Sequence, residues 1–214
     1  MSNDDIPINW SPESDDDYEM ARAELRRRFA AWSAERAIAV GGDGPEAPLH
    51  YKWSLIDGHL TRWTRHDLNE MYLEICPAKV IAEEEELGEI LDEARTLITF
   101  LADTDLLDPQ SDPPDVLIDH LTRIESRFRA HMTDVSRYSF GKRLAIAASA
   151  EGVQPDDTPA LEAFMARFNS RPRAEREAIL GPLPGVSRPM ATGRFTPPGT
   201  RATVPSNKKR KRRR

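Results

Sequence analysis

Hydrophobic positions recur every three or four residues along most of the chain, which is the spacing of one buried face of an α-helix. The first such stripe consists of Tyr18, Ala21, Leu25, Phe29 and Trp32. Ser11 or Ser14 can serve as the helix N-cap, and the acids 15–17 suit the positive end of the helix dipole. We predict a helix that starts after one of these serines and ends at the glycine-rich residues 41–45.

Residues 49–63 follow a different pattern. Leu49, Tyr51, Trp53 and Leu55 alternate with polar residues, and an Asp-Gly pair follows at 57–58. Alternation and an Asp-Gly turn are typical of a β-hairpin, so we predict a small hairpin over 49–63. A helix through residues 51–60 is the alternative.

The helical period returns after residue 63 and continues to residue 180. Thr64 and Ser139 are expected N-caps, and Gly152 is an expected left-handed C-cap. The predicted helices span about 64–76, 83–101, 112–128, 139–150, 158–168 and 172–180. The fold class is therefore mainly α, a compact bundle of about six to seven helices.

The two ends of the chain differ from this body. Residues 1–13 are acidic and aperiodic, and we expect them to be disordered. Residues 182–214 hold six of the 17 prolines and few large apolar residues. Such a stretch buries too little apolar surface to offset the entropy lost on ordering. We predict a helical domain over 14–181 that is followed by a disordered, proline-rich basic tail.

Charge is segregated along the chain. The formal net charge is −6, but the residues after Gly181 carry ten cations and no acid, which leaves −16 for the chain up to Gly181. The single cysteine excludes an internal disulfide framework, and no apolar run is long enough for a transmembrane helix. The acidic start does not resemble a secretory signal, so we expect a cytoplasmic protein.

The last seven residues form an uninterrupted cationic run, which is Lys208, Lys209, Arg210, Lys211, Arg212, Arg213 and Arg214. Such runs are typical of disordered arms that bind phosphate backbones without sequence specificity. This run predicts a nucleic-acid-binding tail. The alternative is contact between the tail and the acidic body of its own or a neighbouring molecule.

Three aromatic residues, Tyr51, Trp53 and Trp63, lie close together in the sequence and among basic residues. Aromatic and basic residues together can stack single-stranded bases, but the acidic body disfavours phosphate. We therefore interpret these rings as core or interface residues, and those that remain exposed as a candidate partner patch.

No set of residues converges on a recognisable catalytic or metal site. His66 and Glu70 are one helical turn apart, which permits a metal site but more often gives an exposed ion pair. Cys76 precedes a proline at an expected helix end and is interpreted as a buried structural thiol. We predict no catalytic residue, no metal ligand and no cofactor.

Three segments together resemble a group of uncharacterised helical proteins from actinobacteria. The segments are Trp63-Thr64-Arg65-His66-Asp67-Leu68, Pro77-Ala78-Lys79-Val80, and 168–176 with Ile179-Leu180-Gly181-Pro182. The resemblance covers about residues 49–182. It implies a helical fold in a bacterial cytosol and no particular activity.

Our leading hypothesis is a non-enzymatic cytosolic helical protein that mediates protein–protein interaction with an unknown partner. The alternative is an accessory nucleic-acid-binding protein that uses the basic tail. A third hypothesis is a small metalloenzyme around His66 and Glu70. The sequence leaves open whether the protein forms a homo-oligomer.

Overall fold

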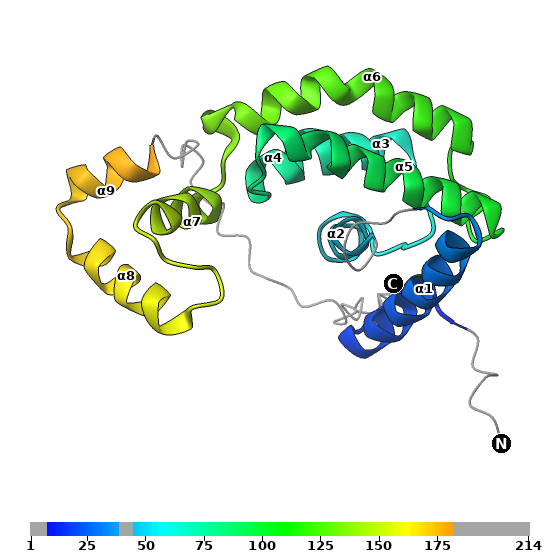
Figure 1. The fold of residues 1–214 in the computed structure, drawn as a ribbon, viewed down its shortest axis with the longest axis horizontal. Coiled ribbons are helices and arrows are strands. Elements are labelled where there is room, and N and C mark those ends of the chain that lie inside the picture. Colours follow the sequence, from blue (N-terminus) through cyan, green and yellow to red (C-terminus); the bar gives the residue numbers. More distant parts are fainter. Residues whose placement is uncertain (1–7, 39–44, 182–214) are drawn as a thin grey trace, which may run out of the picture. The chain divides into compact units, whose positions relative to one another are not determined.

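A computed structural model of the chain describes residues 8–38 and 45–181, and within these ranges it contains helices and turns but no strand. The mainly helical fold class is confirmed (Figure 1). The helices are α1 (Asp15–Glu35), α2 (Glu46–Tyr51), α3 (Arg65–Asn69), α4 (Cys76–Lys79), α5 (Leu87–Asp103), α6 (Pro114–Thr133), α7 (Phe140–Ala150), α8 (Thr158–Ser170) and α9 (Arg173–Leu180). Two π-helical segments, η2 (Lys52–Ile56) and η3 (Glu70–Ile75), continue α2 and α3, and η4 (Glu84–Glu86) and η5 (Val135–Arg137) are single 3-10 turns. The predicted basic tail lies outside the described residues.

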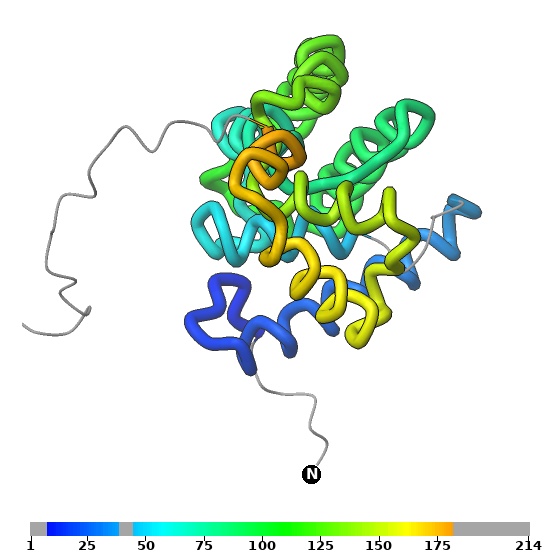
Figure 2. Tube along the Cα trace, turned by 90° about the vertical axis from the view of Figure 1, so that its left-hand side faces the viewer, coloured from blue at the N-terminus to red at the C-terminus, as the bar shows by residue number. Residues whose placement is uncertain are grey.

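A large apolar core joins the elements from α1 to α6. The predicted stripe of α1 is buried in this core, and Ser14 caps the helix by accepting a hydrogen bond from the Asp17 N–H. Phe29 and Trp32 of α1 meet Phe100 of α5 edge to face. Helices α5 and α6 lie side by side (Figures 1 and 2).

The predicted hairpin over 49–63 is wrong, because residues 46–56 are helical. The alternation had placed Lys52 on a solvent face, but its side chain is 0% exposed. Its Nζ lies 2.9 Å from Asp57 Oδ1 and 2.9 Å from Asp67 Oδ2, so two carboxylates compensate the buried charge. The Asp-Gly pair ends the helix, since Gly58 adopts a positive φ and its N–H donates to the Lys52 carbonyl, as in a left-handed helix cap.

The helix that begins after Thr64 continues past its predicted end at Cys76 and Pro77, because the chain widens into the π-helical segment η3. A proline lacks an N–H and crowds the carbonyl four residues earlier, which is that of Leu73. The wider π turn relieves this crowding. The Leu73 carbonyl accepts hydrogen bonds from His131 Nδ1 at 2.9 Å and Arg137 at 3.4 Å.

Part of the segment expected to be disordered packs on the large core instead. Ile8 and Trp10 contact this core, and Pro12 is buried. The Trp10 carbonyl accepts a hydrogen bond of 2.9 Å from the Leu60 N–H. The expectation for residues 8–13 is therefore corrected, since their aromatic and aliphatic side chains gain enough burial to be held in place. Residues 1–7 lie outside the described residues.

Helices α7, α8 and α9 enclose a second, smaller core made by Ala148, Val153, Phe164, Phe168 and Leu180 (Figure 2). The start of α7 is joined to the end of α4 by two hydrogen bonds to carbonyls that the helix itself leaves unpaired. The Ser139 N–H donates to the Ala78 carbonyl at 3.0 Å, and Lys142 Nζ donates to the Pro77 carbonyl at 3.1 Å.

Candidate functional site

Helix α7 has its charged and apolar side chains on unexpected sides. Lys142 and Arg143 are only 5% and 4% exposed, whereas Phe140 is 47% exposed. Ile146 on the same helix is also exposed. A surface helix ordinarily buries its apolar residues and leaves lysine and arginine in water. The exposed side of α7 is therefore a candidate contact surface.

The two buried cations hold α7 in this orientation. Burial lowers the pKa of Lys142. In addition to its bond with Pro77, Lys142 Nζ lies 3.8 Å from the centre of the Tyr138 ring, where the ring face attracts the cation. The guanidinium of Arg143 donates to the Val135 carbonyl at 2.8 Å and to the Leu180 carbonyl at the end of α9. Arg143 thus fixes α9 against α7.

A pocket of about 390 Å³ opens between α7, α8 and α9. Its lining residues are Phe140, Phe168, Asn169, Arg173, Arg176, Glu177 and Leu180. Phe168 and Leu180 belong to the small core, and Phe140 adds an exposed aromatic wall. The pocket therefore joins an apolar surface to polar groups of α8 and α9.

The two arginines of this pocket differ in their partners. Arg173 donates to Glu177 Oε1 at 2.6 Å, one turn along α9. Arg176 has a buried Nε without a hydrogen-bond acceptor, and no described residue forms an ion pair with its guanidinium. A buried donor is normally satisfied, so the Arg176 Nε–H is the group in this pocket with unmet hydrogen-bonding capacity.

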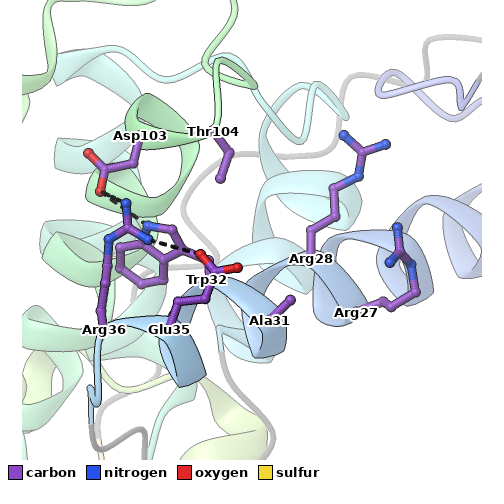
Figure 3. Close-up of a pocket in the computed structure, with 8 residues that line it drawn as sticks. All are labelled: Arg27, Arg28, Ala31, Trp32, Glu35, Arg36, Asp103 and Thr104. Atoms are coloured by element: carbon purple, nitrogen blue, oxygen red, sulfur yellow. Dashed lines mark hydrogen bonds and ion pairs between the residues drawn. The ribbon is translucent and has the colours of Figure 1, made fainter.

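A second pocket, of about 400 Å³, lies beside the end of α1 and the end of α5 (Figure 3). Its lining residues are Arg27, Arg28, Ala31, Trp32, Glu35, Arg36, Asp103 and Thr104. Arg36 lies over the Trp32 ring and 3.2 Å from Asp103 Oδ2, which also accepts from the Trp32 indole N–H.

The arginines of this second pocket are already engaged by carboxylates. Hydrogen bonds from Arg27 and then Arg28, acting against burial, lower the pKa of Glu24 to about 2. An incoming anion would have to displace Glu24 or Asp103 from these pairs. The second pocket is therefore the weaker candidate for binding a charged ligand.

The predicted aromatic patch is divided by the fold. Trp63 is 1% exposed, and its indole N–H donates to the Leu60 carbonyl inside the core. Tyr51 and Trp53 are half-buried, and Trp53 stacks on Tyr18 with the ring centres 4.0 Å apart. Trp63 offers no contact surface in this structure, and a partner patch at Tyr51 and Trp53 stays a prediction.

Two ionisable side chains near Cys76 are buried to different extents, Tyr72 fully and Glu93 partly. Burial, together with the nearby Glu93, raises the pKa of the Cys76 thiol to about 12. Burial, with Glu46 as a smaller cause, raises the pKa of Glu93 to about 7. Tyr72 is also buried, and its hydroxyl has no hydrogen-bond partner among the described residues. A thiol that keeps its proton is a poor nucleophile, which fits the structural role predicted for Cys76.

His66 and Glu70 lie on the surface, with His66 Nε2 3.9 Å from Glu70 Oε2. Within residues 8–38 and 45–181, no three His, Cys, Asp or Glu side chains are grouped so that they could hold a metal ion. His66 and Glu70 therefore remain a pair without a third ligand in this part of the chain.

Comparison of the chain with known protein families, with curated proteins and with solved structures finds no match. The resemblance noted from the sequence stays a prediction. No helix in the described part of the chain has the length and hydrophobicity needed to span a bilayer.

Proposed function

We propose that this protein is a non-enzymatic helical protein of the cytosol that binds another protein through α7, α8 and α9. The observation that supports this proposal is the inverted burial on α7, where Phe140 is exposed while Lys142 and Arg143 are buried. Burying two cations costs desolvation energy, and leaving a phenylalanine in water forfeits its transfer energy. Carbonyl oxygens and the Tyr138 ring around the two cations offset the first cost, and a partner that covers Phe140 would recover the second.

The composition of the surface suits protein binding. Aromatic and arginine side chains contribute most to protein interfaces, and Phe140 lies beside the pocket with Arg173 and Arg176. The acid in the same pocket, Glu177, is paired with Arg173 and is not held as a free general base. The surface therefore favours binding over catalysis.

Site-specific photo-crosslinking tests the proposal. A photoreactive amino acid is placed at Phe140, and in a control protein at Met20, which is similarly exposed on α1. We expect a defined protein to crosslink at position 140 but not at position 20. The crosslinked protein is then purified and its affinity measured directly. Phe140→Asp should weaken that affinity about tenfold or more, because a central interface aromatic is lost, whereas Met20→Asp should not.

The proposal fails if Phe140→Asp and Met20→Asp bind the purified partner with the same affinity as the native chain. Circular dichroism of both variants shows whether the helices are retained. Since Phe140 is exposed, its replacement is expected to leave the fold intact.

The basic tail supports a second candidate function, that of an accessory nucleic-acid-binding protein. Its seven consecutive cations, with no acid after Gly181, can neutralise phosphates regardless of base sequence. This function does not compete with protein binding at α7–α9, because the two use different parts of the chain. A salt titration of binding to DNA and RNA tests this function.

A further inference from the structure

We propose that the pocket between α7, α8 and α9 binds an acidic peptide segment of the partner protein, with one apolar side chain inserted and a neighbouring carboxylate on Arg176. This inference rests on the proposed protein-binding function and specifies the chemistry of the partner. Its evidence is the set of residues that line the pocket rather than the exposure of Phe140 on α7.

The apolar half of the pocket fits one inserted side chain. Phe168 and Leu180 are buried parts of its wall, and Phe140 is the exposed part. The pocket volume of about 390 Å³ is at the lower end of the range for ligand sites. Such a pocket admits one aliphatic or aromatic side chain from an extended or helical segment of the partner.

The polar half of the pocket contains a hydrogen-bond donor, the Arg176 Nε–H, that lacks an acceptor among the described residues. The Arg176 Nε is buried and has no acceptor in the described part of the chain, and its neighbour Arg173 is paired with Glu177. A carboxylate next to the inserted side chain would accept from the Arg176 fork in a charge-assisted hydrogen bond.

The surroundings favour a peptide over nucleic acid. A phosphate backbone carries no apolar side chain for the wall formed by Phe140, Phe168 and Leu180. The chain up to Gly181 carries a net charge of −16, which repels a long polyanion but leaves a short acidic segment able to reach Arg176. Charge complementarity at the pocket thus points to one or two carboxylates beside an apolar anchor.

Fluorescence anisotropy with short synthetic peptides and the full chain tests the inference. The probe is a fluorescein-labelled peptide with a central leucine flanked by glutamates. Two control peptides carry glutamine for glutamate, or alanine for leucine. We expect the acidic leucine peptide to bind about tenfold more tightly than either control, because each control removes one half of the recognition.

Protein variants locate this binding at the pocket. Arg176→Gln should weaken binding of the acidic leucine peptide about tenfold and leave the glutamine peptide within about twofold. Arg127→Gln removes the same charge from an exposed site on α6 and should have no such effect. Both variants keep the basic tail, so any contribution of the tail to peptide binding is the same in each.

A second variant tests the inference independently, in case Arg176→Gln misfolds. Asn169→Asp adds a negative charge at the pocket without removing the arginine, and it should also weaken the acidic peptide selectively. Equal effects of Arg176→Gln and Arg127→Gln would overturn the inference. Self-association of the chain that Arg176→Gln abolishes would also overturn it, because the occupant would then be a second copy.

The failure of this inference can be told apart from failure of the proposed function. If the crosslinked partner protein depends on Phe140 but not on Arg176, protein binding stands and the acidic segment is wrong. If the partner depends on neither residue, both proposals fail.

Discussion

Lys52 and Asp67 form a buried ion pair, with Nζ and Oδ2 2.9 Å apart, that joins the start of η2 to the first turn of α3. Asp67 also accepts a hydrogen bond from the Thr64 N–H, so one carboxylate both pairs with a lysine and caps a helix. Although burial acts in the opposite direction, hydrogen bonds from Lys52 and Arg62 keep the pKa of the second partner, Asp57, below its ordinary value.

Replacing Lys52 with methionine should destabilise the protein strongly. Lys52→Met keeps the apolar stem but leaves the buried Asp67 carboxylate without its cation, which typically costs about 3 kcal/mol or more. Chemical denaturation followed by circular dichroism measures the loss in unfolding free energy. Lys79→Met, at an exposed lysine, serves as the control and should be nearly neutral. Unchanged stability of Lys52→Met would show that the pair is not needed.

Gly181→Ala should destabilise the end of α9 more than Gly152→Ala destabilises the end of α7. Both glycines have a positive φ, but a Cβ on Gly181 would lie 2.8 Å from the Arg143 guanidinium, whereas one on Gly152 meets nothing within 4 Å. The backbone of Gly181 combines a positive φ with an extended ψ, which is a region that glycine alone adopts readily.

Hydrogen exchange measures this difference. We expect Gly152→Ala to cost about 1 kcal/mol from backbone strain and Gly181→Ala to cost more, with faster exchange in α9. Because Leu180 lines the peptide pocket, Gly181→Ala should also weaken the acidic peptide. Equal destabilisation by the two substitutions would contradict a steric role for Arg143.

Glu93 should make stability depend on pH near neutrality. Its pKa in the fold is raised to about 7 from 4.5, chiefly by burial and then by Glu46, so the folded chain holds this proton more tightly than the unfolded chain. The resulting stabilisation is complete below the unfolded pKa of about 4.5 and is lost as the pH rises through about 7. Because the side chain is partly exposed and screened by solvent, the total change is on the order of 2 kcal/mol.

Glu93→Gln removes this titration. As the pH rises from about 5 to about 8, the unfolding free energy of the native chain should therefore fall relative to that of the variant. Urea denaturation at several pH values measures this difference, and the comparison cancels the effects of other carboxylates. Glu89→Gln, on the exposed side of α5, is the control. A constant difference across this range would mean that Glu93 is not held protonated by the fold.

The basic tail should give strongly salt-dependent binding to nucleic acid. If all seven cations of residues 208–214 neutralise phosphates, the logarithm of the binding constant falls with the logarithm of salt concentration at a slope of about −6 for duplex DNA and about −5 for single strands. A variant with serine at positions 208–214 should lose this binding. The same slope in the native chain and the variant would exclude the tail as the binding element.

Local signals in the sequence were sufficient for most helix starts. Thr64 and Ser139 cap helices as predicted, and Ser14 caps α1 as one of the two serines proposed for it, because a cap depends on a side chain and a backbone N–H only a few positions away. The hairpin prediction failed because an Asp-Gly pair serves equally as a turn and as a helix end. Lys52 is buried there because the nearby Asp57 and the distant Asp67 both pair with its ammonium group.

The candidate site could not be predicted from the sequence, because it too depends on contacts between residues that are distant in sequence. The exposure of Phe140 depends on Lys142 and Arg143 bonding to carbonyls at Pro77 and Leu180, which are remote in sequence. The unpaired state of the Arg176 Nε likewise depends on how α7, α8 and α9 meet. Residue types alone gave no reason to expect that Arg176, unlike the neighbouring arginines, would lack a partner in the described part of the chain. The structural role of Cys76, in contrast, could be predicted from its position before a proline at an expected helix end.

The π-helical segment η3 also bears on how this chain should be aligned with relatives. A π turn holds one residue more than an α turn, so a relative that lacks one residue within 70–75 can keep a continuous helix by forming an ordinary turn. Every position after the gap would then turn by about 100° around the helix axis unless the numbering is shifted by one. Alignments that forbid gaps inside helices will therefore misplace Cys76 and Pro77.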